Sequence, residues 1–193
     1  MRYVLMRHEN DDVTEWIYRE IERLGEGTLN KEQVMERVAS VLVDPIGSYV
    51  HDEVKEYVRQ REERHRESAE RAAREGTRII EEPNKLLVVS KRVRELAGDQ
   101  PLTVAYNDIF RTEITARSVA RVVGGNLVAG RLYEAVEVYD WMREHQKDNG
   151  LAVIVTHQPA VQRILGYVKA RHSDAYLVSE ENSRYKVVEE LGG

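Results

Sequence analysis

The chain has 193 residues, of which 41% are hydrophobic and 33% are charged, and its formal net charge is -5 at pH 7. This composition is typical of a soluble globular protein with an apolar core, and the negative charge argues against nucleic acid as a constant partner. The sequence contains no cysteine, which excludes disulfides, thiolate zinc sites and cysteine nucleophiles. No segment has the length and apolarity of a membrane span, and a strand pattern begins at residue 3 in place of a signal peptide, so we expect a cytoplasmic protein with no membrane partner.

The first strand is expected at residues 3–6, which are apolar and stop abruptly at Arg7 and His8. Helical periodicity then replaces the strand pattern over residues 12–80. The spacing of apolar residues, glycines and prolines predicts one helix at residues 14–24, a second that opens with a capping box at Asn30 and Gln33, and a third at residues 51–75.

The second half of that third helix, residues 60–75, consists mainly of interleaved arginine and glutamate. Charge pairs at i,i+4 contribute only about 0.3–0.5 kcal/mol each. We therefore expect an arm that stands in solvent. The alternative interpretations are a lid, a surface for a partner, and a contact in a homodimer.

After residue 83 helices and strands alternate. Helices are expected at residues 86–96, 112–123, 133–146 and 160–169, and strands at residues 102–106, 126–129, 151–156, 176–178 and 185–188. Such alternation implies a largely parallel sheet with helices on both faces. We predict a three-layer α/β fold in one domain, residues 1–193, with residues 12–80 as a helical insertion after the first strand.

Arginine and histidine side chains gather where the predicted strands end. His8 and His157 each follow a strand directly, Arg7 ends the first strand, and Arg111 lies at a strand-to-helix junction. The carboxyl ends of parallel strands meet at one edge of a sheet. Arginine binds phosphate through two parallel hydrogen bonds, and neutral imidazole is a competent nucleophile at neutral pH.

We therefore expect a phosphate pocket at this edge, with His8 as the nucleophile and His157 stabilising charge in the transition state. The sequence has no short-spaced cluster of metal ligands and no glycine-rich phosphate loop that ends in Lys-Ser or Lys-Thr. The chemistry is accordingly predicted to need no metal and no cofactor.

Three segments resemble motifs of the histidine phosphatase superfamily, which includes the phosphoglycerate mutases. They are residues 3–8 (Tyr-Val-Leu-Met-Arg-His), residues 107–116 (Asn-Asp-Ile-Phe-Arg-Thr-Glu-Ile-Thr-Ala) and residues 153–159 (Val-Ile-Val-Thr-His-Gln-Pro). The resemblance implies that His8 forms a phosphohistidine. It also implies that the pocket is completed by three further side chains, Arg7, Arg111 and His157.

The same resemblance implies two further roles. Glu134 stands where the family often has its proton-donating glutamate, and Thr14 stands where the family often has a residue that touches phosphate. For Glu134, a carboxylate that merely stabilises a helix N-terminus is the alternative.

One residue departs from the family pattern, because Glu9 replaces the usual glycine after the nucleophile. A carboxylate there would repel phosphate unless it points away or is protonated. We expect Glu9 to be turned outward; the alternatives are an unusual proton donor and a weakly active site. The histidines outside the motifs are expected at the surface: His51, His65, His145 and His172.

The leading hypothesis is a metal-independent phosphatase, a phosphoric monoester hydrolase, that acts through phosphohistidine on a small phosphorylated substrate or a phosphoprotein. One alternative is a protein phosphohistidine phosphatase whose arm recognises the protein substrate. A phosphoglycerate-type mutase is disfavoured, because one helix between Glu134 and the next strand leaves little room for a mutase lid. The last alternative is a phosphate-binding or scaffold protein without catalytic activity.

Overall fold

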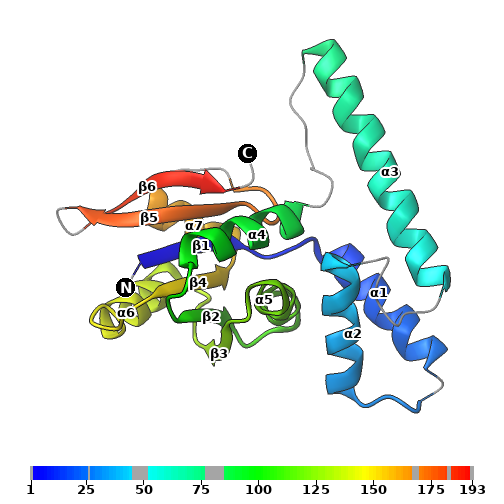
Figure 1. Ribbon diagram of the computed structural model, residues 1–193, viewed down its shortest axis with the longest axis horizontal. Coiled ribbons are helices and arrows are strands. Elements are labelled where there is room, and N and C mark those ends of the chain that lie inside the picture. The colour runs from blue at the N-terminus through cyan, green and yellow to red at the C-terminus, as the bar shows by residue number, and fades with distance from the viewer. Residues whose placement is uncertain are drawn as a thin grey trace.

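The computed structural model describes residues 2–25, 27–44, 52–76, 85–166, 170–181 and 184–191. Within these residues the strands are β1 (Arg2–Arg7), β2 (Leu102–Asn107), β3 (Asn126–Gly130), β4 (Leu151–Thr156), β5 (Ala175–Glu181) and β6 (Arg184–Leu191). They form one sheet in the order β3-β2-β4-β1-β5-β6 (Figure 1). The pairs from β3 to β1 are parallel, whereas β5 and β6 are antiparallel. The predicted, largely parallel sheet is confirmed.

Helices cover both faces of this sheet. One face carries α4 (Lys85–Ala97) and α5 (Phe110–Val123), and the other carries α6 (Ala135–Glu144) and α7 (Gln158–Leu165). Alternate residues of β1 serve the two sides: Val4 and Met6 join the core under α4 and α5, and Tyr3 and Leu5 join the core under α6 and α7. The three-layer prediction is therefore confirmed.

The predicted helices differ from the observed ones mainly at their ends. The helix expected over residues 160–169 begins two residues earlier and ends at Leu165, because Gly166 takes a left-handed conformation with φ of 70°. Residues 167–169 lie outside the described part of the chain. The strands β5 and β6 are longer than expected because each is a full partner in an antiparallel hairpin.

In the described part of the chain between β1 and α4, the helices are α1 (Asp11–Leu24), α2 (Lys31–Val43) and α3 (Asp52–Glu75). Figure 1 places them beyond the carboxyl end of β1, with α3 as a long separate arm. The predicted capping box of α2 is present, with Asn30 and Gln33 each accepting from the other's backbone N–H at 2.9 Å. Pro45 and Gly47, which interrupt the helical pattern of the sequence after this helix, lie outside the described residues. No described helix is long and apolar enough to cross a membrane.

A third apolar cluster joins the inserted helices to the rest of the molecule. Ile17 and Ile21 of α1 pack with Val34 and Val38 of α2, and Ile114 of α5 completes the cluster. All five side chains are essentially inaccessible to solvent. Helix α5 therefore contacts the sheet on one side and the inserted helices on the other.

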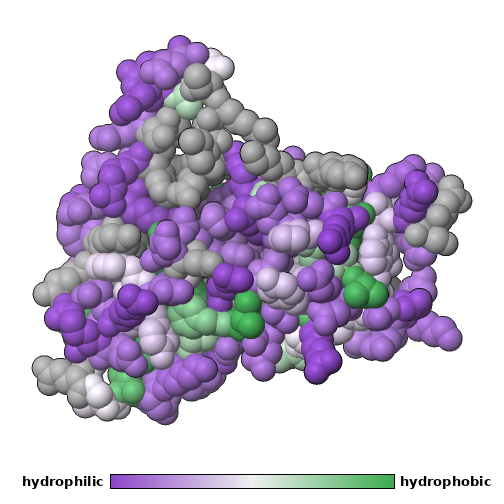
Figure 2. Space-filling model, turned by 180° about the vertical axis from the view of Figure 1, so that it is seen from behind, coloured by the Kyte–Doolittle hydropathy of each residue, from purple (hydrophilic) through white to green (hydrophobic). Residues whose placement is uncertain are grey.

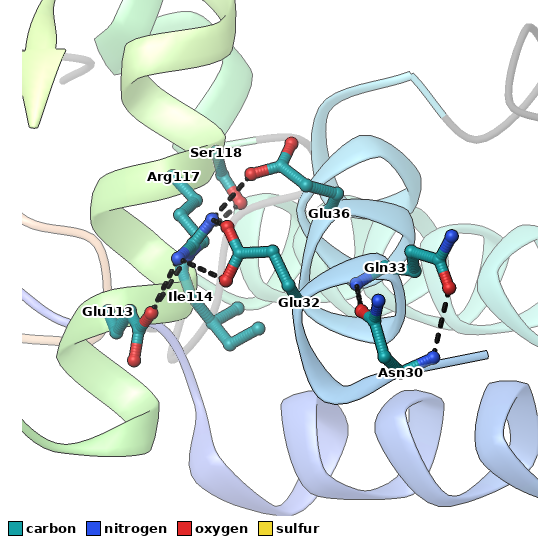
Figure 3. A network of polar contacts seen from close by, with 8 residues as sticks. All are labelled: Asn30, Glu32, Gln33, Glu36, Glu113, Ile114, Arg117 and Ser118. Carbon is teal, nitrogen blue, oxygen red and sulfur yellow. Dashed lines mark hydrogen bonds and ion pairs between the residues drawn. The ribbon is translucent and has the colours of Figure 1, made fainter.

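Arg117 adds a polar connection between α2 and α5 (Figure 3). Its guanidinium donates to Glu32 at 2.7 Å, Glu36 at 2.6 Å and Glu113 at 2.8 Å. Only 11% of the Arg117 side chain is exposed, whereas Glu32 and Glu36 are 66% and 48% exposed. One shielded arginine thus holds three carboxylates from two helices.

Replacing Arg117 with methionine is expected to lower the free energy of unfolding by about 1–2 kcal/mol, because several charge-assisted hydrogen bonds are lost but two partners are partly solvated. Urea unfolding measures this difference. The matched control is Arg19→Met, which removes an ion pair whose partners are 76% and 53% exposed, and whose loss should cost less than about 0.5 kcal/mol. Equal losses for the two variants would contradict the prediction.

Candidate active site

The carboxyl ends of β1 and β4 bring the two predicted histidines together. Arg7 lies opposite Thr156 in the parallel pair, and the His8 N–H donates to the Thr156 carbonyl at 3.1 Å. The rings of His8 and His157 have centroids 5.1 Å apart and meet edge to face. Each residue is only 5% exposed. The strand ends therefore form a shielded pair of imidazoles.

The hydrogen bond of His8 determines which ring nitrogen is available for chemistry. Its Nδ1 lies 2.7 Å from the backbone carbonyl oxygen of Glu9. Because a carbonyl oxygen only accepts, Nδ1 must carry the proton. The neutral ring then presents an unprotonated Nε2, which is the form required of a nucleophile.

Arg7 is held by a loop after α7 that the sequence did not single out. Its Nη1 donates to the Ala170 carbonyl at 2.8 Å, and its Nη2 lies 2.9 Å from Nε2 of His172. The His172 ring is also 5.8 Å from that of His8. The expectation that His172 is a surface residue is wrong: it is partly buried and supports Arg7. No spacing pattern marks it, because it comes from an irregular loop.

Arg111 lies in the first turn of α5, partly buried at the same edge of the sheet. The next turn of this helix contacts the residue after the nucleophile, since Thr115 Oγ1 accepts from the Glu9 N–H at 2.9 Å. Thr115 Oγ1 also donates to the Arg111 carbonyl at 2.9 Å. Arg111 thus lies one helical turn before Thr115, the residue of α5 that contacts Glu9. The binding of phosphate by Arg111 remains a prediction.

Glu9 is buried, and the expectation that it turns outward is wrong. It is 9% exposed. Oε1 accepts from the Asn10 N–H at 2.7 Å, and Oε2 accepts from the Ser173 hydroxyl at 2.9 Å. Arg61 of α3 lies 3.7 Å from Oε1. The carboxylate stays inside because two donors and one cation offset the cost of its burial.

The two remaining predicted site residues make contacts of other kinds. Thr14 is fully buried, and its hydroxyl donates to the Asn10 carbonyl at 3.2 Å within the first turn of α1. Glu134 is the N-cap residue of α6, and its carboxylate lies 3.5 Å from Arg163. The phosphate contact of Thr14 and the acid role of Glu134 both remain predictions.

Tyr133, which the sequence did not single out, is the residue beside Glu134 that reaches the paired histidines. Its ring centroid lies 4.4 Å from that of His157, while the residue remains 49% exposed. A half-exposed ring on a buried imidazole marks the border between the site and solvent. The carboxylate of Glu134, one residue further along the chain, is 51% exposed.

Asp174 is a buried residue that fixes the loop packed against Arg7. Its carboxylate pairs with Lys85 at 2.6 Å and accepts from the Arg171 N–H at 2.6 Å and from the Tyr176 hydroxyl at 3.2 Å. Its carbonyl accepts from the Arg7 N–H at 2.9 Å. Burial, together with the charge of Asp174, raises the pKa of Tyr176. Tyr176 therefore remains a hydrogen-bond donor to this carboxylate at neutral pH.

The local field at this edge favours an anion. Helix α5 begins after β2, and α7 begins after β4 with His157 as its N-cap residue. Helix N-termini carry partial positive charge and unpaired N–H groups that suit phosphate. Across the described residues no group of three or more histidine, aspartate or glutamate side chains has an arrangement suited to a metal ion. This edge of the α/β sheet thus brings together two imidazoles, the guanidinium of Arg7 and two helix N-termini.

Comparison with known proteins adds two structural likenesses. No protein-family model and no curated protein matches the sequence. The structure is similar to that of the putative phosphohistidine phosphatase SixA from Agrobacterium tumefaciens, with 16% identity, a TM-score of 0.40, and coverage of 54% of this chain and 78% of that chain. It is also similar to a mycobacterial glucosyl-3-phosphoglycerate phosphatase in complex with VO3, with 10% identity, a TM-score of 0.48, and coverage of 97% of each chain.

Both similar proteins belong to the histidine phosphatase superfamily, the family whose three motifs this sequence resembles. The identities of 16% and 10% are low, and both TM-scores are below 0.5. The assignment of roles to His8, His157, Arg7 and Arg111 therefore rests on the motifs and on the contacts of this chain.

Proposed function

We propose that the protein is a phosphoric monoester hydrolase that works without a metal ion and passes the phosphoryl group through His8. One observation supports this most strongly: Nδ1 of His8 donates a hydrogen bond to the Glu9 carbonyl at 2.7 Å, which places the proton of the neutral ring on Nδ1, and the ring packs against that of His157. A neutral imidazole with one nitrogen engaged in this way needs no separate base to act as a nucleophile.

In the first step, Nε2 of His8 attacks phosphorus, a P–N bond forms, and the bond from phosphorus to the ester oxygen breaks. The leaving oxygen takes a proton from a general acid. Arg7, Arg111 and His157 neutralise the non-bridging oxygens, where charge is concentrated in the transition state. In the second step, water attacks phosphorus and passes a proton to the carboxylate that the general acid left behind, the P–N bond breaks, and inorganic phosphate leaves with His8 neutral again.

Glu134 is the proposed general acid, with Glu9 as the alternative. The carboxylate of Glu134 is 51% exposed beside Tyr133, whose ring covers His157, so it stands at the mouth where a leaving alcohol would emerge. Both oxygens of Glu9 instead accept hydrogen bonds, from Asn10 and Ser173. Both carboxylate oxygens of Glu9 are thus engaged by donors of the protein, which favours Glu134 for the role.

Glu134→Gln should lower kcat by about 10²-fold or more for an alkyl phosphate, because general acid catalysis contributes about that much. For p-nitrophenyl phosphate the loss should be small, since nitrophenolate departs without protonation. The measurement is kcat for a series of esters with leaving groups of different basicity. Glu9→Gln should show no such dependence on the leaving group. The reverse pattern would contradict the assignment and identify Glu9 as the acid.

The second candidate function is phosphate binding without turnover, and the burial of Glu9 is the observation that favours it. A negative charge directly after the nucleophile opposes an incoming dianion. The test is hydrolysis of a panel of phosphate esters and phosphohistidine peptides, with chelator present, alongside binding of vanadate. Hydrolysis that depends on His8 supports the phosphatase, and the preferred substrate separates small esters from phosphoproteins. Vanadate binding without any hydrolysis would instead establish the binding protein.

A further inference from the structure

The long arm α3 has one charged side chain that does not follow the expected solvated pattern. Most of its described side chains are exposed, and the arm, at the upper left of Figure 2, presents a mainly hydrophilic surface. The exceptions are Arg61, whose side chain is 12% exposed, and Ala72, which is 8% exposed. Eleven residues are three helical turns, so both lie on one face of α3. Arg61 has a contact with the rest of the protein.

Arg61 enters the candidate active site from that face. Its Nη2 lies 3.7 Å from Oε1 of Glu9, the residue after the nucleophile. That separation gives electrostatic attraction but is too long for a hydrogen bond. Glu9 takes its close hydrogen bonds from Asn10 and Ser173 instead, at 2.7 Å and 2.9 Å. Among the side chains that the structure describes, the ion-pair partner of Arg61 is Glu9.

A guanidinium that is largely shielded from water needs hydrogen-bond acceptors for its five N–H groups. Glu9 neutralises part of the charge of Arg61 but, at 3.7 Å, does not fill those donor positions. A phosphate has three accessible oxygens and fits the planar fork of arginine bidentately. The site next to His8 is where the proposed function places that phosphate.

The geometry points to Arg61 as a third phosphate-binding arginine of this site, delivered by α3 and held near Glu9 when no ligand is bound. This inference rests on the proposed function, because the ligand is the substrate's phosphoryl group. Arg7, Arg111 and Arg61 together with Glu9 leave a net charge of two positive, which matches a phosphate monoester dianion. The substrate class is accordingly dianionic monoesters in preference to diesters, which carry one charge.

The inference also gives Glu9 a role. A carboxylate after the nucleophile would by itself repel the ligand. With Arg61 opposite, the carboxylate instead holds the arginine close to the position that phosphate will occupy. The insertion is then part of the binding site for the transferred group, and α3 is more than a solvated arm.

The test is calorimetric titration of the full-length protein with inorganic phosphate. Arg61→Ala should weaken the Kd by about 10- to 100-fold, as expected for loss of a charge-assisted bidentate contact, and Arg61→Lys should restore part of the loss. The matched control is Arg64→Ala, which removes an exposed arginine one turn further along α3 and should leave the Kd within about twofold, as for an exposed surface charge. Circular dichroism of each variant checks that helix content is kept.

A double variant separates direct binding from simple charge compensation. If Arg61 contacts phosphate, Arg61→Ala combined with Glu9→Gln remains a weak binder. Recovery of wild-type affinity in the double variant would show that Arg61 only offsets Glu9, and would overturn the inference. Unchanged affinity in Arg61→Ala would overturn it as well.

Because binding is measured without turnover, the two proposals can fail separately. If the wild-type protein hydrolyses no ester but Arg61→Ala binds phosphate more weakly than wild type, the inference about Arg61 stands and the phosphatase function is rejected. Turnover that depends on His8 together with normal phosphate binding by Arg61→Ala would keep the phosphatase and reject the inference. A wild-type protein that binds no phosphate would reject both.

Discussion

His8→Ala is expected to lower kcat for any hydrolysed phosphomonoester by at least about 10³-fold, because it removes the atom that forms the covalent intermediate. Alanine also removes the hydrogen bond from Nδ1 to the Glu9 carbonyl, but the strand that supports residue 8 is buried and should keep its place. The measurement is steady-state hydrolysis of the best ester, with chelator present, for wild type and variant.

The matched control is His145→Ala. His145 stacks on Trp141 with ring centroids 4.0 Å apart. It has no role in the proposed reaction. Its loss should leave kcat within about twofold of the wild-type value, as for a change away from the reacting atoms. Hydrolysis by His8→Ala at more than a tenth of the wild-type rate would contradict the assignment of His8 as nucleophile.

The largest effect on stability is expected for Asp174→Ala, which should lower the free energy of unfolding by about 3–5 kcal/mol, as when one partner of a buried ion pair is removed. The side chains of Lys85 and Asp174 are 6% and 2% exposed. Without the carboxylate, Lys85 keeps a buried charge and the Tyr176 hydroxyl and Arg171 N–H lose an acceptor. Urea unfolding measures the change.

Lys85→Met should cost less than Asp174→Ala, because Asp174 still accepts from Tyr176 and Arg171 when the lysine is gone. Asp140→Ala is the control, since it breaks an ion pair with Arg143 whose partners are 51% and 74% exposed. Exposed pairs of this kind contribute about 0–1 kcal/mol. A loss of stability from Asp174→Ala no greater than that from Asp140→Ala would contradict the stabilising role of the buried Lys85–Asp174 pair.

The sequence was sufficient to predict the sheet and the paired histidines because both depend on local patterns. Residues 3–6 and 151–156 are short apolar runs, each followed directly by a polar residue, and each is a buried strand. In a parallel sheet two such strands end at one edge. His8 and His157 had to lie near each other once β1 and β4 were neighbours.

The side chains that support the site could not be predicted in this way. His172, Ser173 and Asp174 come from an irregular loop whose path no periodicity determines. Their roles depend on contacts with residues more than 80 positions away, such as that of Ser173 with Glu9 and that of Asp174 with Lys85. Ser173 adopts a left-handed backbone conformation with φ of 59°. This conformation is uncommon for serine, so it could not be predicted from the residue type.

Glu9 and Arg61 show why orientation is harder to predict than position. A carboxylate beside a phosphate site was expected to face solvent, since burial of an isolated charge is costly. The structure instead supplies donors from Asn10 and Ser173 and a cation from Arg61. Asn10 is the next residue of the chain, but Ser173 and Arg61 come from distant segments, and only the tertiary structure brings them to Glu9.

The role of His8 as nucleophile can be tested directly by trapping the covalent phosphohistidine intermediate. Wild-type protein is mixed with a ³²P-labelled phosphomonoester, stopped in alkali within milliseconds and analysed by peptide mass spectrometry. We expect a phosphoryl group on His8 that is stable in alkali and lost in acid, as is typical of a P–N bond, and no label on His8→Ala. Rapid turnover with no label on His8, or with the label on another residue, would contradict this role.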